Sequence, residues 1–245
     1  MSGSFNSRGA LELGDGLIIS CFGKKKSGKS VMGRLLAYSY PRDVIVICAN
    51  HDDGPFEDKE AGIHEIEADA ESMPRRWPEH LRGEDKGKMT LRVQVDPGSP
   101  TFVEDQDAAV GLALRHGNCA LLVHEVGLLA PSNRVPPHTR RLLHANRHRG
   151  VTAILCGPRP LTVDALVIAQ SDVVYTFELK VPQDRKRVAE TCGWDPRDFD
   201  EAVEELGPHE YLRFDANEPK PEGDEPDLRL VHMPALPEDV VKALP

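Results

Sequence analysis

The sequence predicts an α/β fold with a mostly parallel central sheet that is flanked by helices. Five short apolar runs have the composition of strands that are buried on both faces. They are residues 17–22, 44–49, 120–123, 151–156 and 173–177. Helix-compatible stretches lie between most of these runs, and such alternation is typical of parallel strands joined by crossover helices. The chain has 245 residues, of which 40% are hydrophobic, so one compact domain of this kind can form.

Helices are expected where a helix-compatible stretch meets residues that start or stop a helix. Pro41 ends the first helix, Gly117 follows the second, and the third begins at Pro137 and stops before Gly150. In chain order, the expected helices are residues 31–38, 104–116, 137–149, 162–170, 184–192 and 198–206.

The other segments give weaker signals. Residues 91–95 alternate apolar and polar side chains, which predicts a half-buried or edge strand. Residues 210–214 and 228–231 are expected to form short strands. Residues 50–90 are polar and interrupted by Gly and Pro, so only a turn at residues 51–55 is assigned there.

Charge divides the chain into two parts. Residues 190–245 contain 16 acids and 5 Lys or Arg, a balance of −11, whereas the rest of the chain carries +1 (−10 minus −11). We expect residues 1–15 to be a flexible lead-in and residues 16–182 to form the core. We expect residues 183–245 to pack on this core as acidic helices, short strands and a Pro-rich loop.

The sequence also indicates the cellular compartment in which the protein is expected. The sequence has no apolar run of membrane-spanning length, and its first residues lack the apolar core of a secretory signal. We therefore expect a cytosolic protein with neither a membrane span nor a signal peptide. The cysteines form no C-x-x-C pair, so reduced, mostly buried thiols are expected rather than a metal site. They are Cys21, Cys48, Cys119, Cys156 and Cys192.

A complete G-x-x-x-x-G-K-[ST] pattern follows the first predicted strand and precedes the first predicted helix. In this context the backbone N–H groups of the loop and the helix N-terminus bind phosphate oxygens. Lys29 is expected to reach the β- and γ-phosphates of ATP, and the Ser30 hydroxyl is expected to ligate Mg²⁺. The expected nucleotide-binding residues are Gly23, Lys24, Lys25, Lys26, Ser27, Gly28, Lys29, Ser30 and Val31.

Hydrolysis of a bound nucleotide also needs a base that activates water, usually at the end of another apolar strand. Glu125 follows the third apolar run and is the expected general base. It is also expected to contact Mg²⁺ through a bridging water. His124 stands just before it, where an aspartate is usual, and imidazole is a poor ligand for oxygen-seeking Mg²⁺. Two arrangements remain open: Ser30 and waters hold the ion, or Asp52 or Asp53 assists.

The order of these parts resembles the FtsK–HerA superfamily of P-loop NTPases (RecA/FtsK-like), whose members pump DNA at the expense of ATP. Within it, the chain looks most like the genome-packaging ATPases of membrane-containing viruses. It also resembles the Zot-like proteins of filamentous phages. The resemblance covers roughly residues 15–215. Its main segments are residues 23–30, 121–125, 146–151, 154–160, 169–175 and 205–212.

This resemblance implies an ATPase that assembles as a ring of five or six copies and moves double-stranded DNA. In such a ring an arginine of one subunit completes the site of the next, and Arg147 and Arg149 are the candidates in this sequence. Residues 126–163 contain six arginines and no acid. Within this basic segment, Arg140 and Arg141 are expected to contact DNA or an acidic neighbouring subunit.

The resemblance also implies a sensor residue after the fourth apolar run. The family usually has a glutamine before an Arg-Pro pair, but this chain has Pro158, which offers no side-chain donor. Two replacements at the γ-phosphate remain open: Arg159 of the same chain, or a residue of the neighbouring subunit. The implied partners include a portal or membrane-vertex protein of a virus, and the implied location is the host cytoplasm or the virion.

The residues also bear on other functions. A small-molecule phosphotransferase is disfavoured because no Arg-rich lid segment is present, and a GTPase is disfavoured because no N-K-x-D motif is present. A nucleotide-binding structural subunit that does not hydrolyse ATP remains open because of His124 and Pro158. A Zot-like assembly ATPase also remains open.

Overall fold

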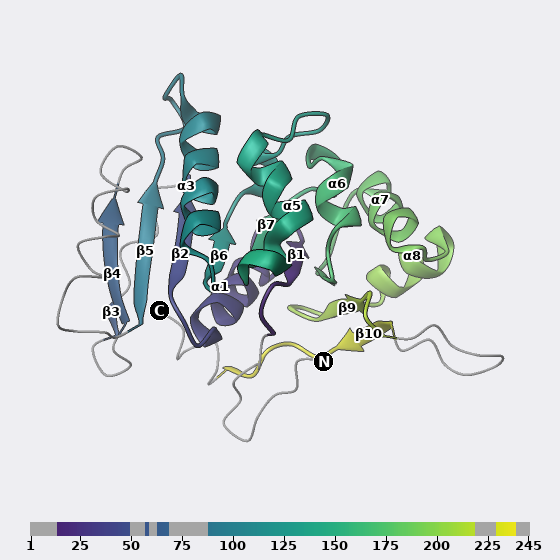
Figure 1. Ribbon diagram of the computed structural model, residues 1–245. Helices are drawn as coiled ribbons and strands as arrows, with labels where there is room; N and C mark the ends of the chain where they lie inside the picture. Colours follow the sequence, from purple (N-terminus) through teal and green to yellow (C-terminus); the bar gives the residue numbers. More distant parts are fainter. Residues whose placement is uncertain (1–13, 50–56, 59–62, 69–87, 219–228, 239–245) are drawn as a thin grey trace.

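The computed structural model describes residues 14–49, 57–58, 63–68, 88–218 and 229–238. Its strands are β1 (Ile18–Phe22), β2 (Val44–Cys48), β3 (Glu57–Asp58), β4 (Ile63–Ala68), β5 (Met89–Gln94), β6 (Ala120–Val123), β7 (Thr152–Gly157), β8 (Val173–Thr176), β9 (Tyr211–Asp215) and β10 (Leu230–Met233). They form one ten-stranded sheet in the order β10-β9-β8-β1-β7-β6-β2-β5-β4-β3 (Figure 1).

The strands from β8 to β4 are mutually parallel, and the antiparallel pairs lie at the two ends of the sheet. At one end β3 is antiparallel to β4, and at the other β9 is antiparallel to both β8 and β10. In the middle, Cys21 of β1 lies in register with Cys156 of β7 and Tyr175 of β8. The predicted mostly parallel sheet is therefore confirmed.

Helices cover both faces of the sheet. They are α1 (Lys29–Ser39), α3 (Phe102–His116), α4 (Val126–Leu129), α5 (Pro137–Arg149), the 3₁₀ helix η1 (Pro160–Thr162), α6 (Ala165–Ala169), α7 (Pro182–Cys192) and α8 (Pro196–Glu204). On one face, α1 buries Met32 and Leu36. On the other, α3, α5 and α7 bury Val110, Leu142 and Val188. These four helices thus bury apolar side chains in the two core clusters, and this burial is the main source of stability.

Two sequence predictions about elements are wrong. Residues 91–95 are not an edge strand, because β5 lies between β2 and β4 and Arg92, a charged residue in the alternation, is buried. Residues 162–170 do not form one helix but η1 followed by α6. The break occurs because Asp164 caps a new helix, its carboxylate accepting a hydrogen bond from the N–H of Leu166 at 3.0 Å.

The sequence signals missed three further elements. Two residues separate the helix α4 from the end of β6, and β3 and β4 lie within residues 50–90, which had no strand assignment. The turn at residues 51–55, with Asp52 and Asp53, lies outside the described residues, as does most of the lead-in. In the C-terminal part, β9 and β10 continue the same sheet and α7 and α8 join its core, so the division at residue 182 stays an expectation.

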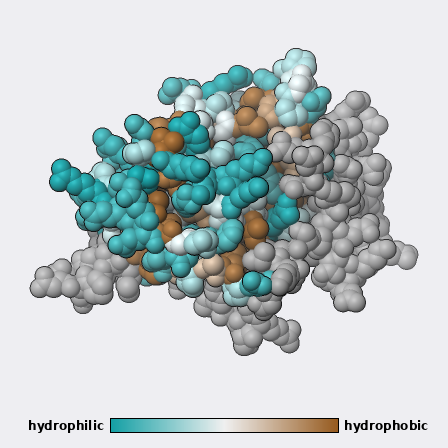
Figure 2. Space-filling view, turned by 180° about the vertical axis from the view of Figure 1, so that it is seen from behind, coloured by the Kyte–Doolittle hydropathy of each residue, from teal (hydrophilic) through white to brown (hydrophobic). Residues whose placement is uncertain are grey.

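The described surface is mostly hydrophilic on the face seen from behind, with apolar side chains in separate spots (Figure 2). Among the described residues, the large apolar side chains that are clearly exposed are Leu128 and Leu161. The same residues include no helix with the length and hydropathy needed to cross a bilayer. All five cysteines are free, and Cys192 is the one that is partly accessible.

Candidate nucleotide-binding site

The candidate site lies where the carboxyl ends of four parallel strands meet. The loop of residues 23–28 leaves β1, Glu125 follows β6, Arg159 follows β7 and Glu178 follows β8. Because β7 lies between β1 and β6, Arg159 comes from the strand beside the loop and Glu125 from the next strand. Open α/β sheets bind their ligands at this edge. The parallel topology thus gathers residues that are more than a hundred positions apart in the sequence.

Backbone hydrogen bonds tie the start of the loop to the segments that follow β7 and β8, the strands on either side of β1. The N–H of Gly23 donates to the carbonyl of Gly157 at 3.4 Å, and the N–H of Lys24 donates to that of Glu178 at 2.9 Å. Gly23 has no room for a side chain, because a Cβ there would lie 2.5 Å from Oγ of Ser27. The loop is therefore held in place by its own strand neighbours before any ligand binds.

The loop ends at an uncapped helix. Gly28 precedes α1 with a φ of 106°, a left-handed conformation that favours glycine, and no side chain caps this N-terminus. The first N–H groups of a helix have no partner within the helix, and the helix dipole makes this end partly positive. The start of α1 is therefore a ready anion site, and the Ser27 hydroxyl beside it is buried without a hydrogen-bond partner.

Lys29 and Glu125 supply the two charges of the site. The side chain of Lys29 is only 7% exposed, although lysine is rarely buried. Burial raises the pKa of Glu125 above its usual value, and the nearby Lys29 ammonium opposes this shift. The two expected catalytic residues therefore lie close enough to interact electrostatically.

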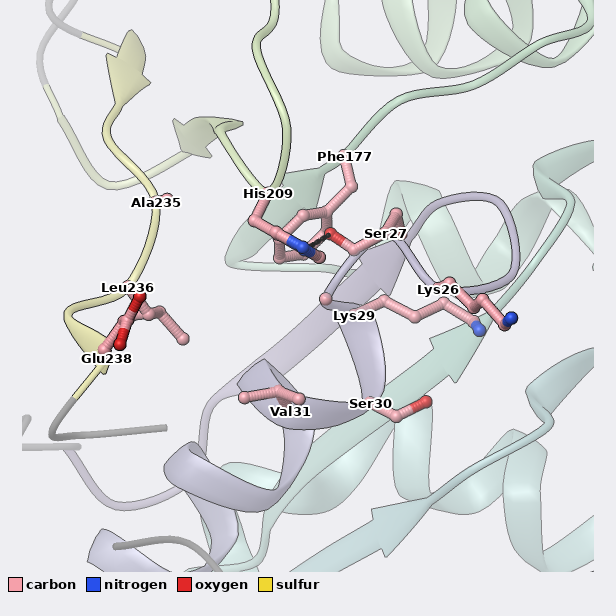
Figure 3. A pocket seen from close by; sticks show the side chains of 11 residues that line it. Lys26, Ser27, Lys29, Ser30, Val31, Phe177, His209, Ala235, Leu236 and Glu238 are labelled. Atoms are coloured by element: carbon pink, nitrogen blue, oxygen red, sulfur yellow. Dashed lines mark hydrogen bonds between the residues drawn. The ribbon is translucent and has the colours of Figure 1, made fainter. Parts of the chain in front are cut away.

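A pocket of about 510 Å³ opens along the loop. Its lining residues are Lys26, Ser27, Gly28, Lys29, Ser30, Val31, Phe177, His209, Ala235, Leu236 and Glu238. Figure 3 shows that the ends of Lys26, Lys29 and Ser30 point to one side of the loop, away from Leu236. The volume lies within the range of small-molecule sites, roughly 300–1,000 Å³. The pocket therefore has a cationic end at Lys29, and at its other end Phe177 and Leu236 lie together with the exposed side chains of His209 and Glu238.

The residues at the polar end fit Mg²⁺ in part. The Ser30 hydroxyl and the Glu125 carboxylate are the oxygen ligands that a hard cation prefers, the latter through a water. His124 contributes an imidazole instead of a second carboxylate. Among the described residues, no group of three or more His, Cys, Asp or Glu is arranged to hold a metal ion. An ion at this end would therefore rely on Ser30, water and the nucleotide phosphates.

Arg159 lies at the same edge but is already engaged. Its Nε donates to a carboxylate oxygen of Asp184 at 3.1 Å, and the other oxygen accepts from the N–H of Leu161 at 3.0 Å. Asp184 is buried, whereas the Arg159 side chain is half-exposed. This ion pair holds Nε of the Arg159 guanidinium against Asp184. The side chain of Pro158, the preceding residue, offers no hydrogen-bonding group.

Arg147 and Arg149 lie at the opposite end of the parallel strands, where β6 and β8 begin. Arg147 is paired with Asp172, just before β8, and the carbonyl of Arg149 accepts from the N–H of Asn118, just before β6. Neither residue is therefore brought together with Lys29 and Glu125 of the same chain. Their expected role in the site of a neighbouring subunit stays a prediction.

Arg140 and Arg141 are exposed on α5, as the sequence suggested for contacts with a polyanion. The helix that carries them is fixed by Asp107 of α3, whose carboxylate accepts from the N–H groups of His138 and Thr139 at 3.0 and 2.8 Å. This buried carboxylate caps the N-terminus of α5. The basic helix thus has a defined orientation, while its DNA contacts stay a prediction.

Solved structures resemble this arrangement over nearly the whole chain. The genome packaging NTPase B204 from Sulfolobus turreted icosahedral virus 2, in complex with AMPPCP, matches with a TM-score of 0.64 and 19% identity, over 91% of this chain and 98% of that chain. The DNA-packaging ATPase B204 from Sulfolobus Turreted Icosahedral Virus matches with a TM-score of 0.65 and 19% identity, over 91% and 100%. The chain has the fold of a viral genome-packaging NTPase.

A third structure, the N-terminal domain of zonular occludens toxin from Neisseria meningitidis, matches with a TM-score of 0.39 and 14% identity, over 67% of this chain and 78% of that chain. No protein-family model and no curated protein sequence matches the chain. The packaging-NTPase fold is therefore established from structure and not from sequence similarity.

Within this packaging-NTPase fold, sequence reasoning missed the apolar half of the pocket. Phe177 was expected at the end of a strand, and residues 235–238 had no assignment beyond the C-terminal part that packs on the core. No sequence pattern indicated that these residues line a pocket, and only the fold brings them to the phosphate loop. The strand assignments at residues 173–177, 210–214 and 228–231 gave a partial signal, because β8, β9 and β10 are neighbours in the sheet.

Proposed function

We propose that this protein is an ATPase that drives double-stranded DNA movement, and that it packages a viral genome. The observation that carries the proposal is the uncapped N-terminus of α1 beside buried Lys29, with Glu125 at the same sheet edge. The packaging-NTPase fold supports it over 91% of the chain. Those structures are described as packaging enzymes, and they were solved with AMP, AMPPCP and ATP-gammaS.

Each residue of the site has a distinct task in this proposal. The N–H groups at the start of α1 and the Lys29 ammonium bind the β- and γ-phosphates, because both present positive charge to them. Ser30 and, through a water, Glu125 would hold Mg²⁺, which neutralises phosphate charge when bound. Glu125 accepts a proton from the attacking water, and Arg159 steadies the γ-phosphate.

Assembly and DNA binding are the second half of the proposal. A ring of five or six copies would place DNA against exposed arginines, and Arg140 and Arg141 are the proposed phosphate contacts. Arg147 and Arg149 are proposed to act only on the site of a neighbouring copy, because they lie far from their own. A portal or membrane-vertex protein is the proposed viral partner, in the host cytoplasm or in the virion.

A structural subunit that binds nucleotide without hydrolysing it is the second candidate. It is favoured by His124, which replaces the usual acid, and by Pro158, which replaces the usual glutamine. Such a subunit would still use Lys29 and the loop to bind ATP. The two candidates therefore differ in turnover and not in nucleotide affinity.

Steady-state phosphate release from ATP separates these candidates. We expect release by the wild type, a higher rate with long double-stranded DNA, and loss of both in Lys29→Ala. ATP binding without release, in Mg²⁺ and in Mn²⁺, would favour the structural subunit. A wild type that binds no nucleotide would exclude both.

A further inference from the structure

We propose that Leu236, His209 and Val31 form the subsite for the nucleobase, and that residues 235–238 are its outer wall. This inference rests on the proposed nucleotide binding and adds the position of the base and the role of the C-terminal segment. The pocket extends along the phosphate loop from Lys29 to Leu236. Its two ends differ in chemistry, and this difference fixes the direction of the ligand.

The phosphate groups must lie at the Lys29 end. The ammonium of Lys29 and the hydroxyl of Ser30 point to that side, as Figure 3 shows. The uncapped N–H groups at the start of α1 would bind the phosphates that lie beside Lys29. A triphosphate bound in this way leaves its sugar and base toward Val31, on the side of Leu236.

The far end of the pocket suits a flat, mostly apolar group. Phe177 closes its floor and is itself buried, with its ring 5.2 Å from that of Tyr211. Leu236 is partly buried and packs on the core cluster that contains α1. Beyond Val31, the described lining side chains with polar groups are His209 and Glu238, and both are exposed. Such a lining holds a base through apolar contact and leaves its polar edge toward water.

His209 covers the pocket from the side of the phosphate loop. Its Nδ1 lies 3.4 Å from the carbonyl oxygen of Ser27, so this contact joins the turn before β9 to the loop. Its φ is 65°, a left-handed conformation that histidine adopts infrequently. A residue held in such a conformation needs support from its surroundings, and here it places the imidazole beside the pocket.

The outer wall comes from the C-terminal segment. β10 ends at Met233, and the chain then passes the pocket, where Ala235, Leu236 and Glu238 line it (Figure 3). Met233 and Leu236 both pack on the α1-side core, which anchors this segment at two points. The acidic C-terminal part of the chain thereby contributes directly to the nucleotide pocket.

Binding of ATP and of inorganic tripolyphosphate tests this assignment, because tripolyphosphate has the phosphates without the base. Both dissociation constants are measured by calorimetry in Mg²⁺ for the wild type, Leu236→Ala, His209→Gly and Lys29→Ala. Pro237→Ala is the matched control, since Pro237 is exposed on the same segment and does not line the pocket. Thermal melting of every variant reports whether it is folded.

We expect Leu236→Ala and His209→Gly each to weaken ATP binding by about tenfold, because each change removes the contact of one side chain with the base. Tripolyphosphate binding should not change in these variants, and Pro237→Ala should match the wild type for both ligands. Equal weakening of both ligands, or no weakening of either, overturns the base subsite. Lys29→Ala should weaken both, and a wild type that binds neither overturns the proposed function itself.

Discussion

Arg147 donates a hydrogen bond to Asp172, and the other oxygen of this carboxylate accepts from the N–H of Ile18 at 2.8 Å. The Asp172 side chain is buried, whereas that of Arg147 is largely exposed. The contact joins the end of α5 to the starts of β1 and β8, at the sheet edge opposite the phosphate loop. Gly16 allows the close approach, because a Cβ there would lie 2.8 Å from the Cα of Arg147.

This relationship predicts a structural cost for removing either partner. Asp172→Ala should lower the free energy of unfolding by about 1–3 kcal/mol, because the N–H of Ile18 loses its acceptor in a buried position. Arg147→Ala should lower it by less, since the arginine is largely exposed. Arg149→Ala is the control and should stay within about 0.5 kcal/mol of the wild type. Urea denaturation measures all three.

The same variants test the role of Arg147 between subunits. An arginine that completes a neighbour's site typically contributes about 10³-fold or more to turnover. If Arg147→Ala loses stability but keeps most of its DNA-stimulated turnover, the arginine is structural. We expect a fall in turnover on that scale in Arg147→Ala under conditions where the variant is still folded, which would show that it acts on the neighbouring site.

Asp107 is predicted to set the stability and the position of the basic helix. Its carboxylate accepts three hydrogen bonds at the start of α5, including one from the Thr139 hydroxyl at 2.7 Å. Asp107→Ala should lower the unfolding free energy by about 1–2 kcal/mol, the usual cost of losing an N-cap. Glu104→Ala, on the exposed part of the same helix, should have little effect. Equal destabilisation by both changes would contradict a specific capping role.

The raised pKa of Glu125 predicts an acid limb in the pH profile of ATP turnover. The carboxylate accepts a proton only when ionised, so turnover should fall as the pH drops through this pKa. Because burial raises the pKa of Glu125, the fall should begin at a higher pH than for an ordinary glutamate, whose pKa is about 4.3. The measurement is kcat/KM for ATP against pH.

Arg140 and Arg141 are predicted to bind the DNA backbone. The double change to alanine should weaken duplex binding and lower the slope of log K against log salt by up to about 2, because two phosphate contacts are lost. ATP turnover without DNA should not change. Lys180→Ala with Arg197→Ala is the control, as both residues are exposed outside the basic helix. An unchanged salt slope in the arginine variant would remove these residues from the DNA interface.

The sequence predicted those parts of the site that are continuous in the chain. The loop at residues 23–30 and Glu125 each follow an apolar run, and the parallel sheet brings both to one edge. Local patterns failed where tertiary burial overrides them. The alternation at residues 91–95 predicts that one face of the strand meets solvent, whereas Arg92 on that face is 2% exposed.

The base end of the pocket was beyond sequence reasoning for a different reason. Phe177, His209 and Leu236 belong to three separate segments, and their proximity depends on the order of β8, β9 and β10 in the sheet. The sequence of a strand that pairs antiparallel at the edge of a sheet does not indicate which strand it pairs with. The location of Arg147 was likewise hidden, since helix periodicity does not show which sheet edge a helix end meets.

The most direct test of the central claim is ATP-dependent movement along DNA. A third oligonucleotide strand is bound to a long duplex, and its displacement by the protein is followed with ATP, with AMPPCP and with the Lys29→Ala variant. We expect displacement by the wild type with ATP alone, because movement requires phosphate release at the Lys29 site. Phosphate release without displacement, or displacement that persists in Lys29→Ala, would contradict an ATP-driven DNA motor.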